Sequence, residues 1–396
     1  MSNIYILDKN IIDYLIYNDF TQTIILIILI VTLIVLFYQK FLNHKKYSNK
    51  DNFSKNEVFS LMKNTPIIYI KSLSLLTGYN IYAKCEYFSY YSSKDRIIKR
   101  IILDAQKNGK INKNSVIYES STGLSGYSTA CICQQLGYNC TIVVPDSCPA
   151  ILISQIKKTN CKLIVTKNVD FSNFSNNYIR LCKKLSEQDK NDFYINLYQN
   201  ELNYITHFEE TAPELYNQLN NKIDAFVCGA DTGGTICGIS HFLKIKNKNC
   251  FVALADIEGS GTSSFIKEGV LFRQEKKEDN NKNEINNFGI GAGNCFLNNN
   301  IRKANIDDCY SCNFYEAMFM IDYLKKNDGI NIGFNEGVNL VGILKMIKNK
   351  NNKLPKNSNI ATVFEDNGMF DNEIINNFNK EKNPIKSIEE IFKINN

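Results

Sequence analysis

The run Ala225-Phe226-Val227-Cys228-Gly229-Ala230-Asp231-Thr232-Gly233-Gly234-Thr235 carries the clearest signal of a fold in this sequence. Four apolar residues come first, a glycine-rich turn follows, and a helical pattern then extends over 235–243. The next strand-like run lies at 251–255, so the order is strand, helix, strand. Such a unit is typical of a parallel sheet whose crossover helix packs on one face.

The same alternation precedes this run. We predict strands at 80–87, 116–119, 140–144 and 162–165, and helices at 95–106, 125–136, 150–159, near 177–185 and around 204–218. The pattern therefore predicts an α/β fold with two open, largely parallel sheets, in which ligands bind outside the carboxyl ends of the strands. A chain of 396 residues is long enough for two such domains.

The composition argues against several classes of function. The net charge of +6 comes largely from Lys/Asn-rich runs at 244–249 and 345–353, which lack the interleaved aromatic residues of a nucleic-acid surface. Many of the thirteen cysteines lie in apolar segments, which indicates reduced thiols rather than a disulfide framework. Cys309-Tyr310-Ser311-Cys312 is a single pair without further ligands, so no metal site is predicted.

The segment 20–39 contains no charged residue. As a helix it would rise about 30 Å, enough to cross the hydrocarbon layer of a membrane. Lys40, Lys45 and Lys46 follow directly, so the C-terminal side is expected in the cytosol. We therefore predict a single-pass membrane protein with an outer or lumenal tail at 1–19 and a linker at 40–60. The outer mitochondrial membrane and the endoplasmic reticulum both fit this pattern.

Three stretches suggest the chemistry. Lys94 stands between the strand at 80–87 and the helix at 95–106, and a lysine can form a Schiff base with a carbonyl cofactor. Glu119 to Gly126 is a Ser/Thr/Gly turn, and Gly229 to Thr235 is a glycine-rich turn. A turn of the second kind, at the start of a helix, offers backbone N–H groups to a phosphate. Together these are the parts of a pyridoxal-phosphate site.

The chain resembles the fold-type II pyridoxal-phosphate enzymes, the tryptophan synthase β-like group, and among them the cysteine synthases and cystathionine β-synthases. The run Asn200 to Asn203 with His207, and the segment 20–39, resemble the membrane-anchored fungal branch. This resemblance implies a catalytic domain at 61–370, a smaller subdomain at about 93–200 and a tail at 371–396. The motifs that carry it, in order, are Thr65-Pro66, Tyr82 to Glu86, Lys94-Asp95-Arg96, Ser121 to Gly126, Thr232 to Thr235, Gly289 to Gly293 and Asp366-Asn367-Gly368.

The resemblance implies that Lys94 holds the cofactor as an internal aldimine and then acts as general base. Serine or O-acetylserine would lose its β-substituent to give an aminoacrylate, and sulfide would add to give cysteine. Hydrolysis of the same intermediate would be a cysteine desulfhydrase activity. Members of the group are commonly homodimers. The implied cofactor-binding residues besides Lys94 are Leu124, Asp231, Thr232, Gly233, Gly234, Thr235 and Asn335, and the implied substrate-binding residues are Ser121, Thr122, Gly123, Ser125 and Leu197.

The chain also departs from the pattern of the group. The run before Lys94, Ser89 to Ser93, is one residue shorter, and Leu124 replaces an asparagine. Leu197-Tyr198 replaces a Gln-Phe pair, Asp231 replaces a glycine, and Asn335 replaces a serine. These changes favour two alternatives beside the enzyme. One is a pseudoenzyme that acts as a membrane-tethered binding or regulatory protein, and the other is an enzyme with a less polar substrate.

Overall fold

The structure, a computed structural model, describes residues 57–167, 177–271, 298–349, 351, 353–371, 375–376, 378 and 383–391. Phe59–Asn396 form one compact unit. The predicted membrane segment at 20–39, the tail at 1–19, most of the linker at 40–60 and the Gly289 to Gly293 motif lie outside the described residues. Among the residues that are described, none of the helices combines the length and apolarity needed to span a membrane.

The larger sheet has six strands in the order β1-β2-β10-β7-β8-β9. β1 pairs antiparallel with β2, and every other neighbouring pair is parallel. All four residues of β7 are buried, because this strand is covered on both faces. The bounds are β1 Ile67–Tyr69, β2 Asn80–Cys85, β10 Asn359–Phe364, β7 Ala225–Cys228, β8 Phe251–Ile257 and β9 Asp308–Cys312.

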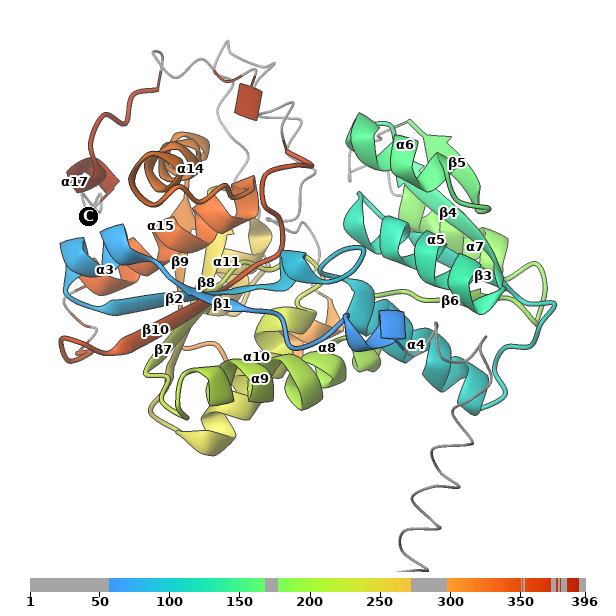
Figure 1. Cartoon of the computed structure of the whole chain (residues 1–396), viewed down its shortest axis with the longest axis horizontal. Helices are drawn as coiled ribbons and strands as arrows, with labels where there is room; N and C mark the ends of the chain where they lie inside the picture. Colours follow the sequence, from blue (N-terminus) through green and yellow to red (C-terminus); the bar gives the residue numbers. More distant parts are fainter. Residues whose placement is uncertain are drawn as a thin grey trace, which may run out of the picture. The chain divides into compact units, whose positions relative to one another are not determined.

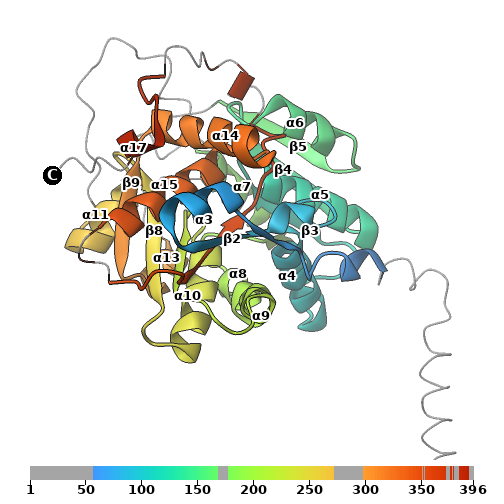
Figure 2. The ribbon, with the colours of Figure 1, turned by 60° about the vertical axis from the view of Figure 1, so that its left-hand side comes forward.

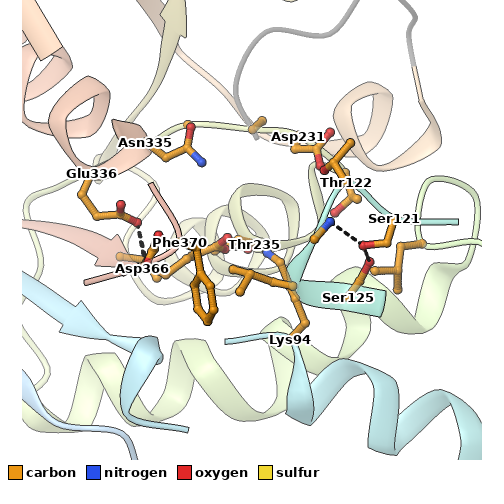
Figure 3. Close-up of a pocket in the computed structure, with 18 of the residues that line it drawn as sticks. Lys94, Ser121, Thr122, Ser125, Asp231, Thr235, Asn335, Glu336, Asp366 and Phe370 are labelled. Atoms are coloured by element: carbon orange, nitrogen blue, oxygen red, sulfur yellow. Dashed lines mark hydrogen bonds and ion pairs between the residues drawn. The ribbon is translucent and has the colours of Figure 1, made fainter. Parts of the chain in front are cut away.

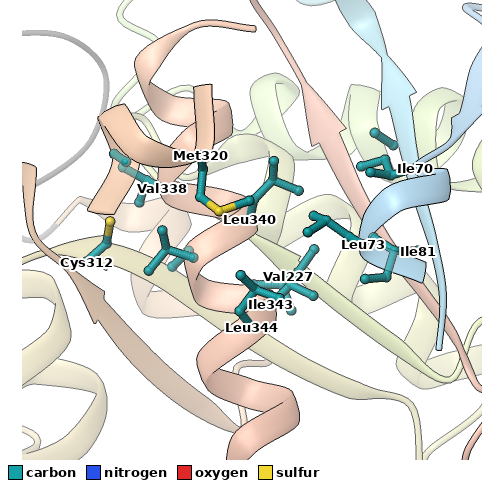
Figure 4. Packing of buried hydrophobic residues seen from close by; sticks show 14 of the residues in the cluster. Ile70, Leu73, Ile81, Val227, Cys312, Met320, Val338, Leu340, Ile343 and Leu344 are labelled. Atoms are coloured by element: carbon teal, nitrogen blue, oxygen red, sulfur yellow. The ribbon is translucent and has the colours of Figure 1, made fainter. Parts of the chain in front are cut away.

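Helices cover both faces of this sheet (Figure 1). Ala225 and Val227 of β7 belong to one apolar cluster, together with residues of α3 (Lys71–Thr77), α14 (Phe314–Asp328) and α15 (Phe334–Lys348), and Figure 4 shows part of its packing. Phe226 and Cys228 belong to a second cluster with α9 (Ala212–Gln218) and α10 (Gly234–Lys246). Successive residues of a strand point to opposite faces, so one short strand contributes to both cores.

The smaller sheet has four parallel strands in the order β5-β4-β3-β6 (Figure 1). All its strands lie within 93–200, as do α4, α5, α6 and α7. The bounds are β5 Lys162–Thr166, β4 Asn139–Pro145, β3 Val116–Ser120, β6 Phe193–Tyr194, α4 Asp95–Lys107, α5 Leu124–Leu136, α6 Ala150–Lys157 and α7 Tyr178–Ser186. Figure 2 shows β5, β4 and β3 with α5 and α6 beside them. Further α-helices are α8 Glu201–Thr206, α11 Gly261–Glu268, α13 Asn299–Lys303 and α17 Ile388–Ile391.

The α/β fold with two open, mostly parallel sheets is confirmed. One correction concerns the helix predicted around 204–218. The structure divides this segment into α8, a π-helical turn at His207–Thr211, and α9. A π turn inserts one residue into the helical ladder and is frequent at functional sites. Here it coincides with the buried side chains of His207 and Thr211, which hydrogen-bond to each other.

Candidate active site

A pocket opens at the carboxyl ends of β3, β7 and β10 (Figure 3). It holds about 1060 Å³ of space, counting its open mouth. This is the position at which open parallel sheets bind ligands. Of the predicted site residues, only Gly234 does not line it. The predicted residues that do are Lys94, Ser121, Thr122, Gly123, Leu124, Ser125, Leu197, Asp231, Thr232, Gly233, Thr235 and Asn335.

Lys94 immediately precedes α4, and the buried carboxylate of Asp95 holds the backbone of the run before the lysine. Asp95 accepts hydrogen bonds from the backbone N–H groups of Tyr91 and Ser92 at 2.7 and 3.1 Å. It also accepts from the hydroxyl of Ser128 at 2.5 Å. The short run before the lysine is therefore tied to the helix that follows it. In this arrangement Lys94 still reaches the pocket, although the run is one residue shorter than in the group it resembles.

The Lys94 ammonium forms an ion pair with Glu365, with 2.5 Å between Nζ and Oε2. Burial lowers the pKa of Lys94, but the charge and the hydrogen bond of Glu365 outweigh it and leave this pKa raised. The other carboxylate oxygen of Glu365 accepts the hydroxyl of Thr235 at 3.1 Å. Glu365 therefore connects the lysine to the first turn of α10.

Gly229–Thr235, called the glycine turn below, leads from β7 into α10. Gly233 caps the helix with a left-handed φ of 76°, which favours glycine. The side chain of Asn203 donates to the Thr232 hydroxyl at 3.0 Å, and Asn300 donates to the Thr232 carbonyl at 2.8 Å. The turn is thus held from outside, and the amino end of a thirteen-residue helix faces the pocket. This is the arrangement that binds phosphate.

Gly234 is the exception among the predicted cofactor residues. Its α-carbon packs on Asn203, and a Cβ there would lie 1.9 Å from Asn203 Oδ1. The need for glycine at this position therefore comes from packing behind the turn. Gly234 does not line the pocket, and its predicted role in binding the cofactor stays a prediction that concerns its backbone N–H.

Asp231, the acidic residue in the glycine turn, accepts a hydrogen bond from the Tyr198 hydroxyl at 3.0 Å. Burial raises the pKa of Asp231 to about 6, while the charge of Lys94 and the bond from Tyr198 act in the opposite direction. Tyr198, in the Leu197-Tyr198 pair, and Asp231, which replaces a glycine, both depart from the pattern of the group. The hydrogen bond joins these two departures. The hydroxyl stabilises the carboxylate beside the turn.

Ser121–Ser125, called the serine turn below, follows β3 and includes the first two residues of α5. The Ser121 hydroxyl oxygen accepts from the backbone N–H groups of Gly123 and Gly126 and from the Ser125 hydroxyl, each at 2.9 Å. Leu124, Leu152 and Leu197 place apolar carbon beside these hydroxyls. This end of the pocket therefore combines a rigid polar turn with an apolar wall.

The amino end of α15 forms the opposite wall. Within the described residues, Asn335 Oδ1 and Glu336 Oε2 are buried and have no hydrogen-bond partner. The other oxygen of Glu336 accepts the backbone N–H groups of Glu365 and Asp366 at 2.7 and 3.1 Å. Burial and the nearby charge of Asp366 raise the pKa of Glu336 well above its ordinary value. A buried polar atom without a partner, beside a pocket, is typical of a ligand contact.

These features fit pyridoxal phosphate. The Lys94 amine can bond to its aldehyde, the amino end of α10 can hold its phosphate, and Asn335 offers an unused polar atom to its ring. The structure contains no cluster of three or more potential metal ligands among the residues it describes.

Sequence reasoning missed Glu365, which touches the lysine, and Asp371, which accepts the Phe334 N–H at 2.7 Å. The signal for Glu365 was present. It follows the apolar strand Asn359–Phe364 and precedes the Asp366-Asn367-Gly368 motif. Identifying that strand would have placed Glu365 at the ligand-binding edge of the sheet.

Comparisons with known proteins identify the family of this chain. The family described as "Pyridoxal-phosphate dependent enzyme" matches residues 58–366. A cysteine synthase of Dictyostelium discoideum is 32% identical over 314 residues, covering 79% of this chain and 82% of that protein. Cysteine synthase 2 of Schizosaccharomyces pombe is 32% identical over 326 residues, covering 79% of this chain and 81% of that protein.

Two solved structures are similar in fold. A hydrogen sulfide-producing enzyme from Fusobacterium nucleatum is 27% identical, with a TM-score of 0.65, covering 79% of this chain and 98% of that one. An O-acetylserine-dependent cystathionine β-synthase from Helicobacter pylori is 23% identical, with a TM-score of 0.67, covering 79% of this chain and 95% of that one. The chain therefore belongs to the pyridoxal-phosphate-dependent enzymes, in the group of the cysteine synthases and cystathionine β-synthases.

Proposed function

We propose that this enzyme makes cysteine from serine or O-acetylserine and sulfide by β-elimination and replacement. The observation that carries the proposal is the position of the Lys94 amine, in one pocket with the glycine turn and the serine turn. The cysteine synthases of Dictyostelium and Schizosaccharomyces, each 32% identical over most of their length, support the choice of reaction.

The residues that line the pocket have separate roles in this proposal. Lys94 would be the attachment point for the cofactor, backbone N–H groups of the glycine turn would hold its phosphate, and Asn335 would contact its ring. When bound, pyridoxal phosphate withdraws electrons from the substrate α-carbon and makes the α-proton acidic. The Lys94 amine, when it is free, would take that proton. The serine turn orients the substrate carboxylate, while Leu124 and Leu197 exclude water from that end.

A cysteine desulfhydrase activity is the second candidate, and one comparison favours it. The Fusobacterium protein is a hydrogen sulfide-producing enzyme and covers 79% of this chain. The residues would keep their roles, because both reactions begin with removal of the α-proton and loss of the β-substituent. With cysteine as the only substrate, the products would be sulfide, pyruvate and ammonia. Measuring sulfide and pyruvate with cysteine alone, and cysteine with serine or O-acetylserine plus sulfide, separates the two reactions.

The first test is the visible absorbance of the purified full-length chain with added pyridoxal phosphate. We expect a band from lysine-bound cofactor that is absent in Lys94→Ala. Lys107→Ala is the matched control, because Lys107 is an exposed lysine in the last turn of the same helix. Absence of the band in the wild type with excess cofactor would contradict the enzyme and favour the membrane-tethered binding or regulatory protein.

We further propose that residues 20–39 anchor the chain in a membrane with the enzyme facing the cytosol, and that the enzyme is a homodimer. The uncharged run and the lysines after it support the anchor. Extraction of membranes at alkaline pH tests it: the full chain should stay in the pellet, and a chain lacking 20–39 should not. Sedimentation of both chains in detergent would give the oligomeric state.

A further inference from the structure

Glu365 contacts two groups that the proposed cofactor chemistry also needs. Its Oε2 lies 2.5 Å from the Lys94 ammonium, and its Oε1 accepts the Thr235 hydroxyl at 3.1 Å. Lys94 is the amine assigned to the cofactor aldehyde, and Thr235 lies in the first turn of α10, to which the phosphate is assigned. One carboxylate therefore engages both the amine and the phosphate turn.

The contact with Lys94 keeps the proton on the amine. Burial by itself lowers the pKa of Lys94, but the charge and the hydrogen bond of Glu365 outweigh it, so this pKa is raised. An ammonium group has no lone pair and cannot attack a carbonyl carbon. The ion pair therefore stabilises the form of Lys94 that does not bond to an aldehyde.

The contact with Thr235 uses a hydroxyl proton that a phosphate could accept. The hydroxyl has a single proton, and Glu365 Oε1 accepts it. His207 Nε2 lies 3.3 Å from the same hydroxyl. Burial and the charges of Arg96 and Lys94 hold the pKa of His207 well below its ordinary value, so its neutral ring adds no charge that attracts a phosphate. The carboxylate of Glu365, in contrast, repels one.

The neighbouring titratable groups do not weaken the ion pair. Asp231 acts on Lys94 through its charge and, like Glu365, raises the pKa of the amine. Burial raises the pKa of Cys228, so its thiol stays neutral. Among the described residues that line the pocket, no second lysine or arginine is present to take Glu365 away from Lys94.

We propose that Glu365 is an internal competitor of the cofactor, which must leave Lys94 and Thr235 before pyridoxal phosphate binds. The carboxylate can turn to solvent, because 28% of the Glu365 side chain is exposed. The proton of Lys94 then passes to water, and the amine and the Thr235 hydroxyl become accessible together. The contact thus holds the site in a form with low affinity for the cofactor. The inference rests on the proposed function, which places pyridoxal phosphate in this pocket.

Removing the charge of Glu365 should therefore speed the reactions of Lys94. In Glu365→Gln the side chain keeps its size, and the largest cause that raises the pKa of Lys94 is lost. Below its pKa, the neutral fraction of a lysine changes about tenfold for each unit of pKa. A hydrogen bond to a charged group changes an equilibrium about tenfold to a hundredfold, so at about pH 8 we expect Lys94 to react faster in the variant by about this factor.

The first arm of the experiment measures the amine without cofactor. The full-length chain is treated with acetic anhydride over about pH 7 to 10, and mass spectrometry gives the acylation rate at Lys94. In the wild type the rate should rise about tenfold per pH unit over this range, because the pKa of Lys94 is raised. In Glu365→Gln the rate should be higher and level off at a lower pH. Glu209→Gln is the control and should follow the wild type, because Glu209 pairs with Arg100 of the same helix at 2.9 Å but does not line the pocket.

The second arm compares the capture of pyridoxal phosphate with that of pyridoxal, which lacks the phosphate. The absorbance band of the lysine-bound compound gives the rate and the affinity. Both compounds should bind faster and more tightly to Glu365→Gln, because Lys94 is more often neutral. The gain should be larger for pyridoxal phosphate, because its phosphate also benefits from the released Thr235 hydroxyl and the lost negative charge.

Equal acylation rates in the wild type and Glu365→Gln would overturn the inference. Weaker capture by the variant would also overturn it, since the carboxylate would then support the bound cofactor. Should the variant not fold, the wild type still decides, because an acylation rate that levels off below about pH 9 shows an amine that no ion pair keeps protonated.

The outcomes for the inference and for the proposed function are distinct. A band in Glu365→Gln but not in the wild type would contradict the proposed function of the natural chain and support the competition. A band in neither protein would overturn the proposed function, and the acylation arm would still decide whether Glu365 holds Lys94 as an ammonium.

Discussion

The hydrogen bond between Tyr198 and Asp231 can be tested directly, by measuring how much it contributes to the free energy of unfolding. In Tyr198→Phe the hydroxyl that donates to Asp231 at 3.0 Å is lost while the ring remains. A hydrogen bond to an ionised group contributes about 1.5–3 kcal/mol to stability, and a neutral one about 0.5–1.5 kcal/mol. The pKa of Asp231 is about 6, so the larger value applies well above this pH and the smaller one below it.

A double-mutant cycle with Tyr198→Phe and Asp231→Ala isolates this bond. Urea unfolding at about pH 8 should give a coupling free energy of about 1.5–3 kcal/mol, falling at about pH 5 to about 0.5–1.5 kcal/mol. Tyr194→Phe is the control, because that phenol bonds to the Ser120 hydroxyl at 2.6 Å and should show no coupling to Asp231. Equal coupling at both pH values, or none at pH 8, would refute the assignment of Asp231 as a carboxylate held by Tyr198.

Three further predictions follow from buried groups. The pKa values of Glu119 and Asp366 are raised by burial to about 8 and about 7, so the folded state binds more protons than the unfolded chain, and the free energy of unfolding should fall as pH rises from about 5 to about 8, measured by urea titration at each pH. Arg96→Met removes the guanidinium that bonds to Glu86 at 2.8 and 3.0 Å and to Glu214 at 3.0 and 3.1 Å. Lys84 then remains as the nearby cation for both carboxylates, and the free energy of unfolding should fall by about 3–5 kcal/mol, seen as a lower urea midpoint. Gly233→Ala introduces a Cβ at 2.8 Å from the Ile301 side chain in a left-handed conformation, and should weaken cofactor binding measured by absorbance titration, whereas unchanged affinity would show that the turn does not hold the phosphate.

The strands and helices around the glycine turn could be predicted from sequence because each short apolar run is bounded by turn residues. β7 at Ala225–Cys228 matches its prediction, and α5 begins one residue earlier than expected, at Leu124. β9, with the sequence Asp-Cys-Tyr-Ser-Cys, was missed because it has no apolar run to mark it. Its assignment as a strand depends on pairing with β8, which is a long-range contact that a local pattern does not contain.

The candidate site likewise contains residues that the sequence predicts and contacts that only the structure shows. Lys94 and the two turns were found because chemistry restricts their residue types and because they follow strands. The ion pair of Lys94 with Glu365 joins residues 271 positions apart, and no spacing rule predicts it. The bond between Tyr198 and Asp231 shows a second limit. In the sequence, each of these two residues is a loss of a family binding residue. Only their contact in the structure shows that the Tyr198 hydroxyl stabilises the Asp231 carboxylate.

The charge balance of the pocket follows from these contacts. Among the described residues that line it, five carry carboxyl groups (Asp231, Glu336, Glu365, Asp366 and Asp371) and Lys94 is the single lysine or arginine, a formal sum of −4 from five negative charges and one positive. Such a sum would repel a phosphate.

The pKa values change this balance. Burial is the first cause of the raised pKa of Asp231, Glu336, Asp366 and Asp371, and Glu365 is paired with Lys94. Near pH 6 the pocket is therefore much closer to neutral than its composition indicates. Because Asp231 ionises in the glycine turn as pH rises through about 6, cofactor affinity should fall over that range. The titration of the phosphate itself is common to wild type and Asp231→Asn, so the ratio of their affinities isolates the carboxylate, and a ratio that does not change with pH would place its charge outside the phosphate site.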